Sequence, residues 1–465
     1  MPLQENMLNA PHVVLIPSAG MGHLTPFSRL AASLSSLCKV SMVSISPTVS
    51  SAESRHLSDM FSAYPDIDPI HFQLPHYDLS DHPDTDPFLL RWEMIGRSAS
   101  EILNHITKST IPVSALVIDI PIAAKFLPLA KSLGIPCYLM FISTAAMLSF
   151  LAYFPTYCDL KTTPGLGNVD IPGLRTVPAA SIPGALHDPK HLFTQLFIEN
   201  GRMLLKFDSV FVNTFESFEK DSLAALREGR VQPGFPPVIA VGPLMPLKMP
   251  ISGTSEVFPW LDKQSANSVV YVNFGNRTAM SKDQIQALGF GLETSGCRFL
   301  WVVKTAVVDA QDVVELDELL GEGFFERVED RAIVTKSWVD QDEVLRHKAV
   351  GGFLSHSGSN SVIEAAMHGV RMLAWPMGGD QRINAVPVVK SRLGMWPENW
   401  SWQGDEKIVT GEEIAEKVKE MMADEGLMVT AHSVGEEARR AAAPGGTSYE
   451  GLLEFVQKLK ELANS

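Results

Sequence analysis

Short apolar segments alternate with longer helical patterns along most of this chain, and this alternation limits its possible folds more than any other feature. The segments are rich in Val, Ile, Leu and Phe, which is typical of parallel strands that helices cover on both faces. One series is expected at residues 12–17, 40–45, 115–120, 137–141 and 210–215, and a second at 268–274, 298–304, 332–338, 351–355 and 372–376. The pattern predicts two successive doubly wound α/β sheets.

The length of the chain supports the same division. With 465 residues, 45% of them apolar, the chain exceeds what one ordinary hydrophobic core accommodates. A proline-rich segment without helical periodicity indicates a linker between the two sheets. We expect an N-terminal domain over residues 1–242, a linker over 243–256, a second domain over 257–448 and an amphipathic C-terminal helix over 449–465.

Charge and cysteine content exclude several classes of function. The chain has 38 basic and 53 acidic residues, a formal charge of −15, which argues against general nucleic-acid binding and against attraction to anionic membranes. Its four cysteines show no CxxC spacing and no matching histidine cluster, so we expect reduced thiols, no disulfide framework and no metal site.

The N-terminus and one long apolar stretch bear on localisation. The first residues lack the basic start and apolar core of a signal peptide, so we expect a cytoplasmic protein. Residues 138–157 are uncharged and near the ~20 residues that a membrane span requires. They also contain Ser, Thr and Pro, and we expect a buried strand followed by a buried helix there.

The stretch from residue 338 to residue 381 carries polar and aromatic side chains in an order suited to a nucleotide. We expect Trp338 to end a strand, with its ring flat against a nucleobase, and Gln341 to reach the base or the ribose. Further on, the run FLSHSGSNSVIEAA passes from a strand through a turn at Gly358 into a helix. The N–H groups and dipole at a helix N-terminus bind phosphate without a basic side chain.

Further donors and acceptors follow in the same stretch. His356, Asn360 and Ser361 are expected to add hydrogen bonds to a diphosphate, and Glu364, about one turn into the helix, to accept from the ribose hydroxyls. Asp380 and Gln381 come after the next strand, at the carboxyl edge where open α/β sheets bind ligands, and are expected to contact sugar hydroxyls. Each residue taken singly also has a purely structural explanation, and it is their order that indicates a nucleotide-sugar site.

A second signal follows the first predicted strand, in the sequence PSAGMGHLTP at residues 17–26. Gly20 and Gly22 permit a tight turn, which presents His23 at the carboxyl end of the strand. A neutral imidazole is suited to take a proton from a phenol near neutral pH. Asp119, at the end of another predicted strand, is the candidate to orient it. The alternatives are a structural His–Asp hydrogen bond or no contact between the two residues.

The stretch from Trp338 to Gln381 resembles the plant secondary-product glycosyltransferase box of the UDP-sugar-dependent glycosyltransferases, which begins with Trp and ends with Gln. The resemblance covers nearly the whole chain and implies the GT-B architecture, with two Rossmann-like domains facing a cleft. It implies that the N-terminal domain binds most of the acceptor, that the other domain binds the UDP-sugar, and that the last helix crosses back to the first domain. It also implies that His23 and Asp119 form the catalytic dyad.

Other segments resemble the plant flavonoid C-glycosyltransferases more narrowly. They are the pair Asp119-Ile120 and the sequences DPFLLRWEMIGRSA, AAMLSFLAYFPTY, DIPGLRTVPAASIPGALHDPKHLF and WVVKTAVVD. This resemblance implies UDP-glucose as donor and a phloretin-like dihydrochalcone, a 2-hydroxyflavanone or a flavone as acceptor. We expect inverting transfer of glucose to an aromatic carbon, with no metal and no prosthetic group. We expect the protein to act as a monomer.

Two short segments depart from the family pattern. Ser357 and Ser359 stand in HSGSNS where HCGWNS is usual, and the second change removes a large ring beside the expected diphosphate site. Asn273 and Asn276 stand in NFGN where SFGS is usual, and we expect Asn276 to alter a phosphate contact. Two alternative functions remain open: an O-glycosyltransferase acting on flavonoids or other phenols, and a non-catalytic protein that binds UDP-sugars or flavonoids.

Overall fold

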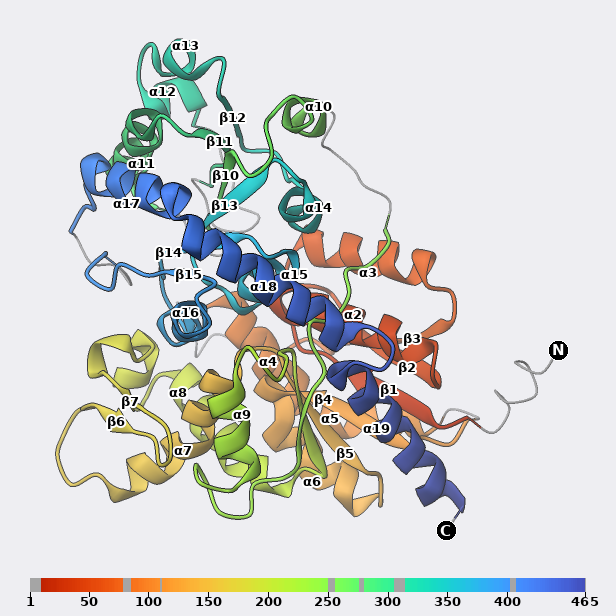
Figure 1. Cartoon of the computed structure of the whole chain (residues 1–465). Helices are drawn as coiled ribbons and strands as arrows, with labels where there is room; N and C mark the ends of the chain where they lie inside the picture. The colour runs from red at the N-terminus through yellow and green to blue at the C-terminus, as the bar shows by residue number, and fades with distance from the viewer. Residues whose placement is uncertain are drawn as a thin grey trace. The chain divides into compact units, whose positions relative to one another are not determined.

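Two compact units make up the chain in a computed structural model, which describes residues 10–77, 85–108, 111–249, 256–275, 280–304, 314–401 and 407–464. Unit 1 combines residues 1–250 with residues 440–465, and unit 2 spans residues 251–439 (Figure 1). Part of the predicted linker, at residues 250–255, and the candidate phosphate contact Asn276 lie outside the described residues.

Unit 1 is built on a seven-stranded parallel sheet with the order β3-β2-β1-β4-β5-β8-β9. The order reverses direction at β1 and β4, the kind of position at which open α/β sheets bind ligands. The strands are β1 (His12–Ile16), β2 (Lys39–Ser46), β3 (Ile67–Gln73), β4 (Ala115–Asp119), β5 (Cys137–Phe141), β8 (Ser209–Val212) and β9 (Val238–Ala240). A small antiparallel pair, β6 (Val169–Asp170) and β7 (Thr176–Val177), lies apart from this sheet.

Helices connect these strands, and several begin at a side chain that caps the first turn. Ser50 accepts from the backbone N–H of Glu53 at the start of α3, and Asp86 accepts from Phe88 at the start of α4. The helices of unit 1 are α2 (Met21–Ser35), α3 (Ser51–Ala63), α4 (Pro87–Arg97), α5 (Ala99–Thr107), α6 (Ala123–Ser132), α7 (Ala145–Leu160), α8 (Leu192–Met203), α9 (Lys220–Arg227) and α19 (Thr447–Asn464).

Unit 2 repeats the architecture around a six-stranded parallel sheet with the order β12-β11-β10-β13-β14-β15. The strands are β10 (Val269–Asn273), β11 (Arg298–Val302), β12 (Ala332–Thr335), β13 (Val350–Ser355), β14 (Arg371–Ala374) and β15 (Gly394–Met395). The helices are α10 (Val257–Leu261), α11 (Lys282–Ser295), α12 (Leu316–Leu320), α13 (Phe324–Val328), α14 (Gln341–Arg346), α15 (Ser359–His368), α16 (Gln381–Lys390), α17 (Gly411–Ala423) and α18 (Glu425–Ala442). The prediction of two doubly wound α/β domains is confirmed.

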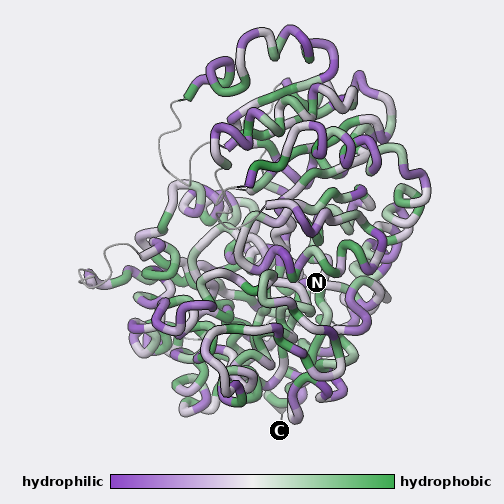
Figure 2. Tube along the Cα trace, turned by 90° about the vertical axis from the view of Figure 1, so that its left-hand side faces the viewer, coloured by the Kyte–Doolittle hydropathy of each residue, from purple (hydrophilic) through white to green (hydrophobic). Residues whose placement is uncertain are grey.

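The last helix, α19, completes the core of unit 1. Phe455 packs edge-on against Tyr138 of β5 and Phe211 of β8, with ring centroids 4.7 and 4.9 Å apart. Ser448 Oγ also donates a hydrogen bond to the carbonyl of Gly242. Figure 1 shows α19, in dark blue, at the C-terminal end of the chain. Figure 2 shows hydrophobic segments running through the interior and many hydrophilic segments along the outside, as burial of apolar side chains requires.

One predicted strand ends earlier in the structure than expected, and the long apolar stretch at 138–157 forms the expected strand and helix. The expected strand at 332–338 ends at Thr335, so Trp338 lies in the loop before α14 and does not end a strand. The chain turns because Thr335 Oγ1 accepts from the N–H of Ser337, and Asp340 then caps α14. Residues 138–157 form most of β5 and α7, as expected. Within the described ranges, no helix is both long and apolar enough to cross a membrane.

Candidate active site

A histidine and an aspartate meet at the carboxyl edge of the unit 1 sheet. His23 lies in the first turn of α2, directly after β1, and Asp119 is the last residue of β4. Because β1 and β4 pair in parallel, their carboxyl ends lie side by side. His23 Nδ1 lies 2.8 Å from Asp119 Oδ2, with the histidine side chain 13% exposed and the aspartate fully buried.

Asp119 accepts three further hydrogen bonds that fix its carboxylate. The backbone N–H and the hydroxyl of Ser18 donate to Oδ2 at 2.9 and 2.6 Å, and the N–H of Ile120 donates to Oδ1 at 2.8 Å. An ionised carboxylate only accepts hydrogen bonds, so His23 Nδ1 carries the hydrogen in this contact. The other ring nitrogen, Nε2, then has the lone pair that a general base needs.

An aromatic side chain of α4 contacts the imidazole. Trp92 meets His23 edge-on, with ring centroids 5.1 Å apart, and its indole N–H donates to the carbonyl of Ala19 at 3.0 Å. Gly20 adopts a φ of +108°, which side chains rarely tolerate, and a Cβ there would lie 3.4 Å from the ring of Phe88. Helix α4 and the glycine turn therefore fix the ring position of His23 from two directions.

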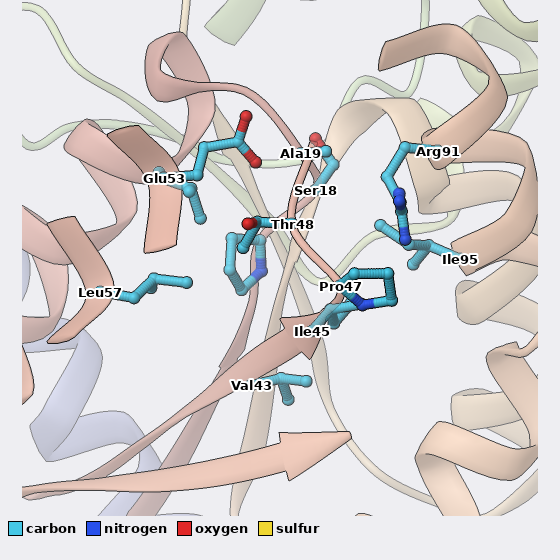
Figure 3. A pocket seen from close by; sticks show the side chains of 12 residues that line it. Ser18, Ala19, Val43, Ile45, Pro47, Thr48, Glu53, Leu57, Arg91 and Ile95 are labelled. Carbon is cyan, nitrogen blue, oxygen red and sulfur yellow. The ribbon is translucent and has the colours of Figure 1, made fainter. Parts of the chain in front are cut away.

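A pocket in unit 1 adjoins the same turn (Figure 3). Burial raises the pKa of Glu53 and lowers the pKa of Arg91, two charged residues in its wall. Arg91 Nη1 is buried without a hydrogen-bond partner in the part of the chain that the structure describes. The lining residues are Pro17, Ser18, Ala19, Leu24, Val43, Ile45, Pro47, Thr48, Glu53, Leu57, Arg91 and Ile95. The pocket thus offers a polar pair within an otherwise mostly apolar wall.

In unit 2, Gln341 connects the helices that carry several of the predicted site residues. It is the first residue of α14, and its Nε2 donates to Ser361 Oγ at 3.0 Å and to Glu364 Oε2 at 2.7 Å, both on α15. Its Oε1 accepts from Asn273 Nδ2 at 3.0 Å. Ser361 and Glu364 are each 6% exposed, so these polar groups are satisfied largely within the protein.

His356 occupies the turn between β13 and α15, in a space that two glycines leave open. A Cβ at Gly275 would approach its Nε2 to 2.9 Å, and one at Gly358 would approach it to 2.5 Å. Burial lowers the pKa of His356 to about 4, although a hydrogen bond with the backbone of Asn273 opposes the shift. The imidazole is therefore neutral near neutral pH.

The N-terminus of α15 follows this turn. Gly358 is the N-cap residue and forms no side-chain capping bond, and Ser359 and Asn360 begin the helix. Ser357, in the turn, adopts a φ of 63° and is fully buried. The first N–H groups of a ten-residue helix thus follow directly after His356, an arrangement suited to an anionic group such as phosphate.

The remaining predicted residues differ in how they are placed. Trp338 is 54% exposed, which leaves a large ring face open to a ligand. Asp380 is the N-cap residue of α16, and Gln381 is its first residue. Gln381 Oε1 accepts from the backbone N–H groups of Met377 and Gly378, at 2.7 and 3.0 Å. The side-chain oxygen of Gln381 therefore holds the loop after β14.

The structure thus brings His23 together with Asp119, and Gln341 together with Ser361 and Glu364, each set within one unit. Ser18 and Trp92 also contribute to the His23 region, although neither is among the predicted site residues. Ser18 lies within the PSAGMGH motif, so its place directly after β1 was the available signal. Trp92 lies in the segment DPFLLRWEMIGRSA, but its contact with His23 joins distant segments of the chain, which a local pattern does not reveal.

Comparisons with known proteins identify the family that the chain resembles over most of its length. Residues 243–427 match the family described as "UDP-glucoronosyl and UDP-glucosyl transferase". The chain is 52% identical over 452 residues to "UDP-glycosyltransferase CGT" of Oryza sativa subsp. japonica, with 96% of each chain covered. It is 50% identical over 461 residues to "UDP-glycosyltransferase 708A6" of Zea mays, with 97% of each chain covered.

A solved structure extends the likeness to three dimensions. The chain is similar to LpCGTa, whose crystal structure is a complex with UDP, with a TM-score of 0.86 and 45% sequence identity. The match covers 97% of this chain and 99% of that one. The similarity therefore includes both units and not only the segment matched by the family.

Proposed function

Because this chain belongs to the UDP-glycosyltransferase family, we propose that it transfers glucose from UDP-glucose to an aromatic carbon of a flavonoid or related polyphenol. Support for attack by carbon comes from the rice relative and the solved structure, whose names contain CGT, an abbreviation for C-glycosyltransferase. The UDP complex of the latter supports a UDP-sugar as donor. We assign the acceptor mainly to unit 1 and the donor mainly to unit 2.

The contact between His23 and Asp119 is the observation that carries this proposal. Asp119 Oδ2, 2.8 Å from Nδ1 of His23, accepts the Nδ1 hydrogen and so leaves Nε2 to accept a proton. The proton comes from a phenolic hydroxyl of the acceptor. Trp92 and the turn at Gly20 keep the imidazole in place while this transfer occurs.

Deprotonation makes the aromatic ring a carbon nucleophile. The negative charge of the phenolate spreads to the ortho carbon, which attacks the anomeric carbon of glucose from the face opposite UDP. A carbon–carbon bond forms as the bond between the anomeric carbon and the UDP oxygen breaks, and UDP leaves with the electron pair. The attacked ring carbon then loses its hydrogen as a proton to solvent, which restores aromaticity, and the imidazolium of His23 returns its proton to the phenolate oxygen. The configuration at the anomeric carbon is inverted.

Unit 2 supplies the groups that bind the donor and stabilise the leaving diphosphate. The N-terminus of α15 and the neutral His356 are assigned to the diphosphate, together with Asn360 and Ser361. Glu364 is assigned to the ribose hydroxyls and the exposed Trp338 to the uracil ring. Asp380 and Gln381 are assigned to the glucose hydroxyls, with the Nε2 group of Gln381 as the donor, because its Oε1 already holds the loop after β14.

The decisive test is the structure of the product. The purified protein is incubated with UDP-glucose and phloretin, and the product is examined by mass spectrometry before and after acid hydrolysis. A C-glucoside survives acid, whereas an O-glucoside releases phloretin. Binding of UDP without any product across a panel of phenols would contradict the proposal and favour a non-catalytic binding protein.

Transfer to oxygen is the second candidate, because the phenolic oxygen is the atom from which His23 takes the proton. The same base and the same donor site serve an O-glycosyltransferase, in which the phenolate oxygen attacks the anomeric carbon directly. A product that acid fully converts back to phloretin would establish this activity in place of C-glycosylation.

A further inference from the structure

Asn273 is the last residue of β10. It lies at the centre of a hydrogen-bond network that includes Gln341, one of the residues predicted to bind the UDP-sugar. Its Nδ2 donates to Gln341 Oε1 at 3.0 Å and to the hydroxyl of Tyr271 at 2.9 Å. Its Oδ1 accepts from the backbone N–H of Gly275 at 3.0 Å. Both amide hydrogens and the carbonyl oxygen are therefore engaged, and this set of partners fixes the orientation of the amide.

The orientation of Asn273 determines that of Gln341. Because Asn273 presents a donor, Gln341 must turn its Oε1 toward it, and its Nε2 then faces Ser361 and Glu364 on α15. Glu364 is 6% exposed, and a carboxylate at that depth requires hydrogen-bond donors. The 2.7 Å bond from Gln341 is one of them.

We propose that Asn273 is a positioning residue that, through Gln341, sets the Glu364 carboxylate in the orientation that receives the ribose hydroxyls of the donor. This inference rests on the proposed function, in which Glu364 binds the ribose. In this proposal Asn273 acts on the nucleotide only through Gln341 and Glu364. Its effect on nucleotide binding should therefore depend on the presence of the ribose hydroxyls. A merely structural effect would weaken binding whether or not these hydroxyls are present.

The variant Asn273→Asp gives the sharpest test because it keeps the shape of the side chain but removes its donor. Gln341 must then turn its Nε2 toward Asp and its Oε1 toward Glu364, which brings two acceptors together and displaces the carboxylate. Asn273→Ser, which retains one donor on a shorter side chain, is expected to be intermediate. Circular dichroism and thermal melting of the full chain establish that each variant is folded.

The readout is the discrimination between UDP and 2′-deoxy-UDP, measured by calorimetry. We expect the unaltered protein to bind UDP about tenfold more tightly than 2′-deoxy-UDP, because the deoxy nucleotide lacks a buried hydrogen bond to a charged group. In Asn273→Asp, UDP should bind about tenfold more weakly while 2′-deoxy-UDP changes little. The KM for UDP-glucose should rise more than kcat falls. The double variant Asn273→Asp, Glu364→Gln should lose no more UDP affinity than Glu364→Gln alone.

Two results would overturn the inference without touching the proposed function. One is an Asn273→Asp protein that loses affinity for both nucleotides equally, and the other is an unaltered protein that binds UDP without discriminating the 2′-hydroxyl. If the unaltered protein bound neither nucleotide, this result would contradict the proposed function and, with it, the inference.

Discussion

Oδ2 of Asp119 lies 2.8 Å from Nδ1 of His23, although 96 residues separate the two in the sequence. The parallel pairing of β1 with β4 brings them together, because His23 lies in the helix that follows β1 and Asp119 is the last residue of β4. Ser18, two residues beyond β1, joins them by donating twice to the same carboxylate oxygen. The topology of the sheet, rather than any local motif, therefore builds the dyad.

Replacing Asp119 by Asn should sharply reduce turnover while leaving the donor site intact. The amide cannot accept from His23, Ser18 and Ile120 as the carboxylate does, so the imidazole loses the bond that fixes its tautomer. We expect kcat to fall by about 10²- to 10⁴-fold, measured with UDP-glucose and phloretin. UDP affinity, measured by calorimetry, should not change.

Ser18→Ala is the matched control for this change. It removes one of the hydrogen bonds to Asp119 but keeps the backbone donor of the same residue. Its kcat should fall far less than that of Asp119→Asn. Equal losses in the two variants would show that Asp119 acts only by holding the turn after β1.

Most of the strands that could be predicted from the sequence are largely buried. The run at 137–141 is almost wholly apolar, the run at 351–355 combines Phe and Leu with two glycines and a serine, and β5 and β13 lie there. Strand β3 (Ile67–Gln73) was missed because its sequence, IDPIHFQ, interrupts the apolar pattern with Asp68 and Pro69. It lies at the edge of the sheet, where polar residues and a proline are tolerated.

The donor residues could be placed in order from the sequence, but their contacts could not. The box from Trp338 to Gln381 gives the succession of strand, turn and helix, and these elements position His356 and Glu364 as the pattern suggests. The bond of Gln341 to Asn273 joins residues 68 positions apart, and no local periodicity reports such a contact. The strand expected to end at Trp338 stopped at Thr335 because a side-chain bond turns the chain there.

Replacing Trp338 by Ala should weaken UDP binding without destabilising the fold. The ring is 54% exposed, so few packing contacts are lost, whereas stacking of an aromatic ring on a base contributes about 1–3 kcal/mol. We expect the Kd for UDP, measured by calorimetry, to rise by roughly 5- to 150-fold. Phe290→Ala, which removes another exposed ring of unit 2 (49% exposed), should change neither the Kd nor the melting temperature.

Replacing Phe455 by Ala should destabilise unit 1, although this residue lies near the end of the chain. Its ring is 2% exposed and packs against Tyr138 and Phe211. Loss of a buried phenylalanine typically costs about 3–5 kcal/mol, which denaturant unfolding would measure. Leu462→Ala is the control on the same helix, because Leu462 is 50% exposed and its loss should cost little.

The free energy of unfolding should fall as the pH drops from about 6.5 toward 4, in part through His56. Burial is the main cause that lowers its pKa from 6.5 to about 4, with Arg29 adding to the shift. Within that window the unfolded chain binds a proton that the folded protein excludes, so acid favours unfolding. The full difference corresponds to roughly 3 kcal/mol for this residue.

His56→Gln isolates this contribution because it removes the titrating ring while a side-chain amide can still reach Ser28, whose hydroxyl lies 2.9 Å from His56 Nε2. Denaturant unfolding of the variant should show a smaller loss of stability between pH 6.5 and pH 4 than the unaltered protein shows. The exposed His76 provides the control, and His76→Gln should leave the slope unchanged. Identical pH slopes for His56→Gln and the unaltered protein would mean that His56 takes up its proton equally well in both states. The remaining slope is assigned partly to His356, whose pKa burial lowers in the same direction.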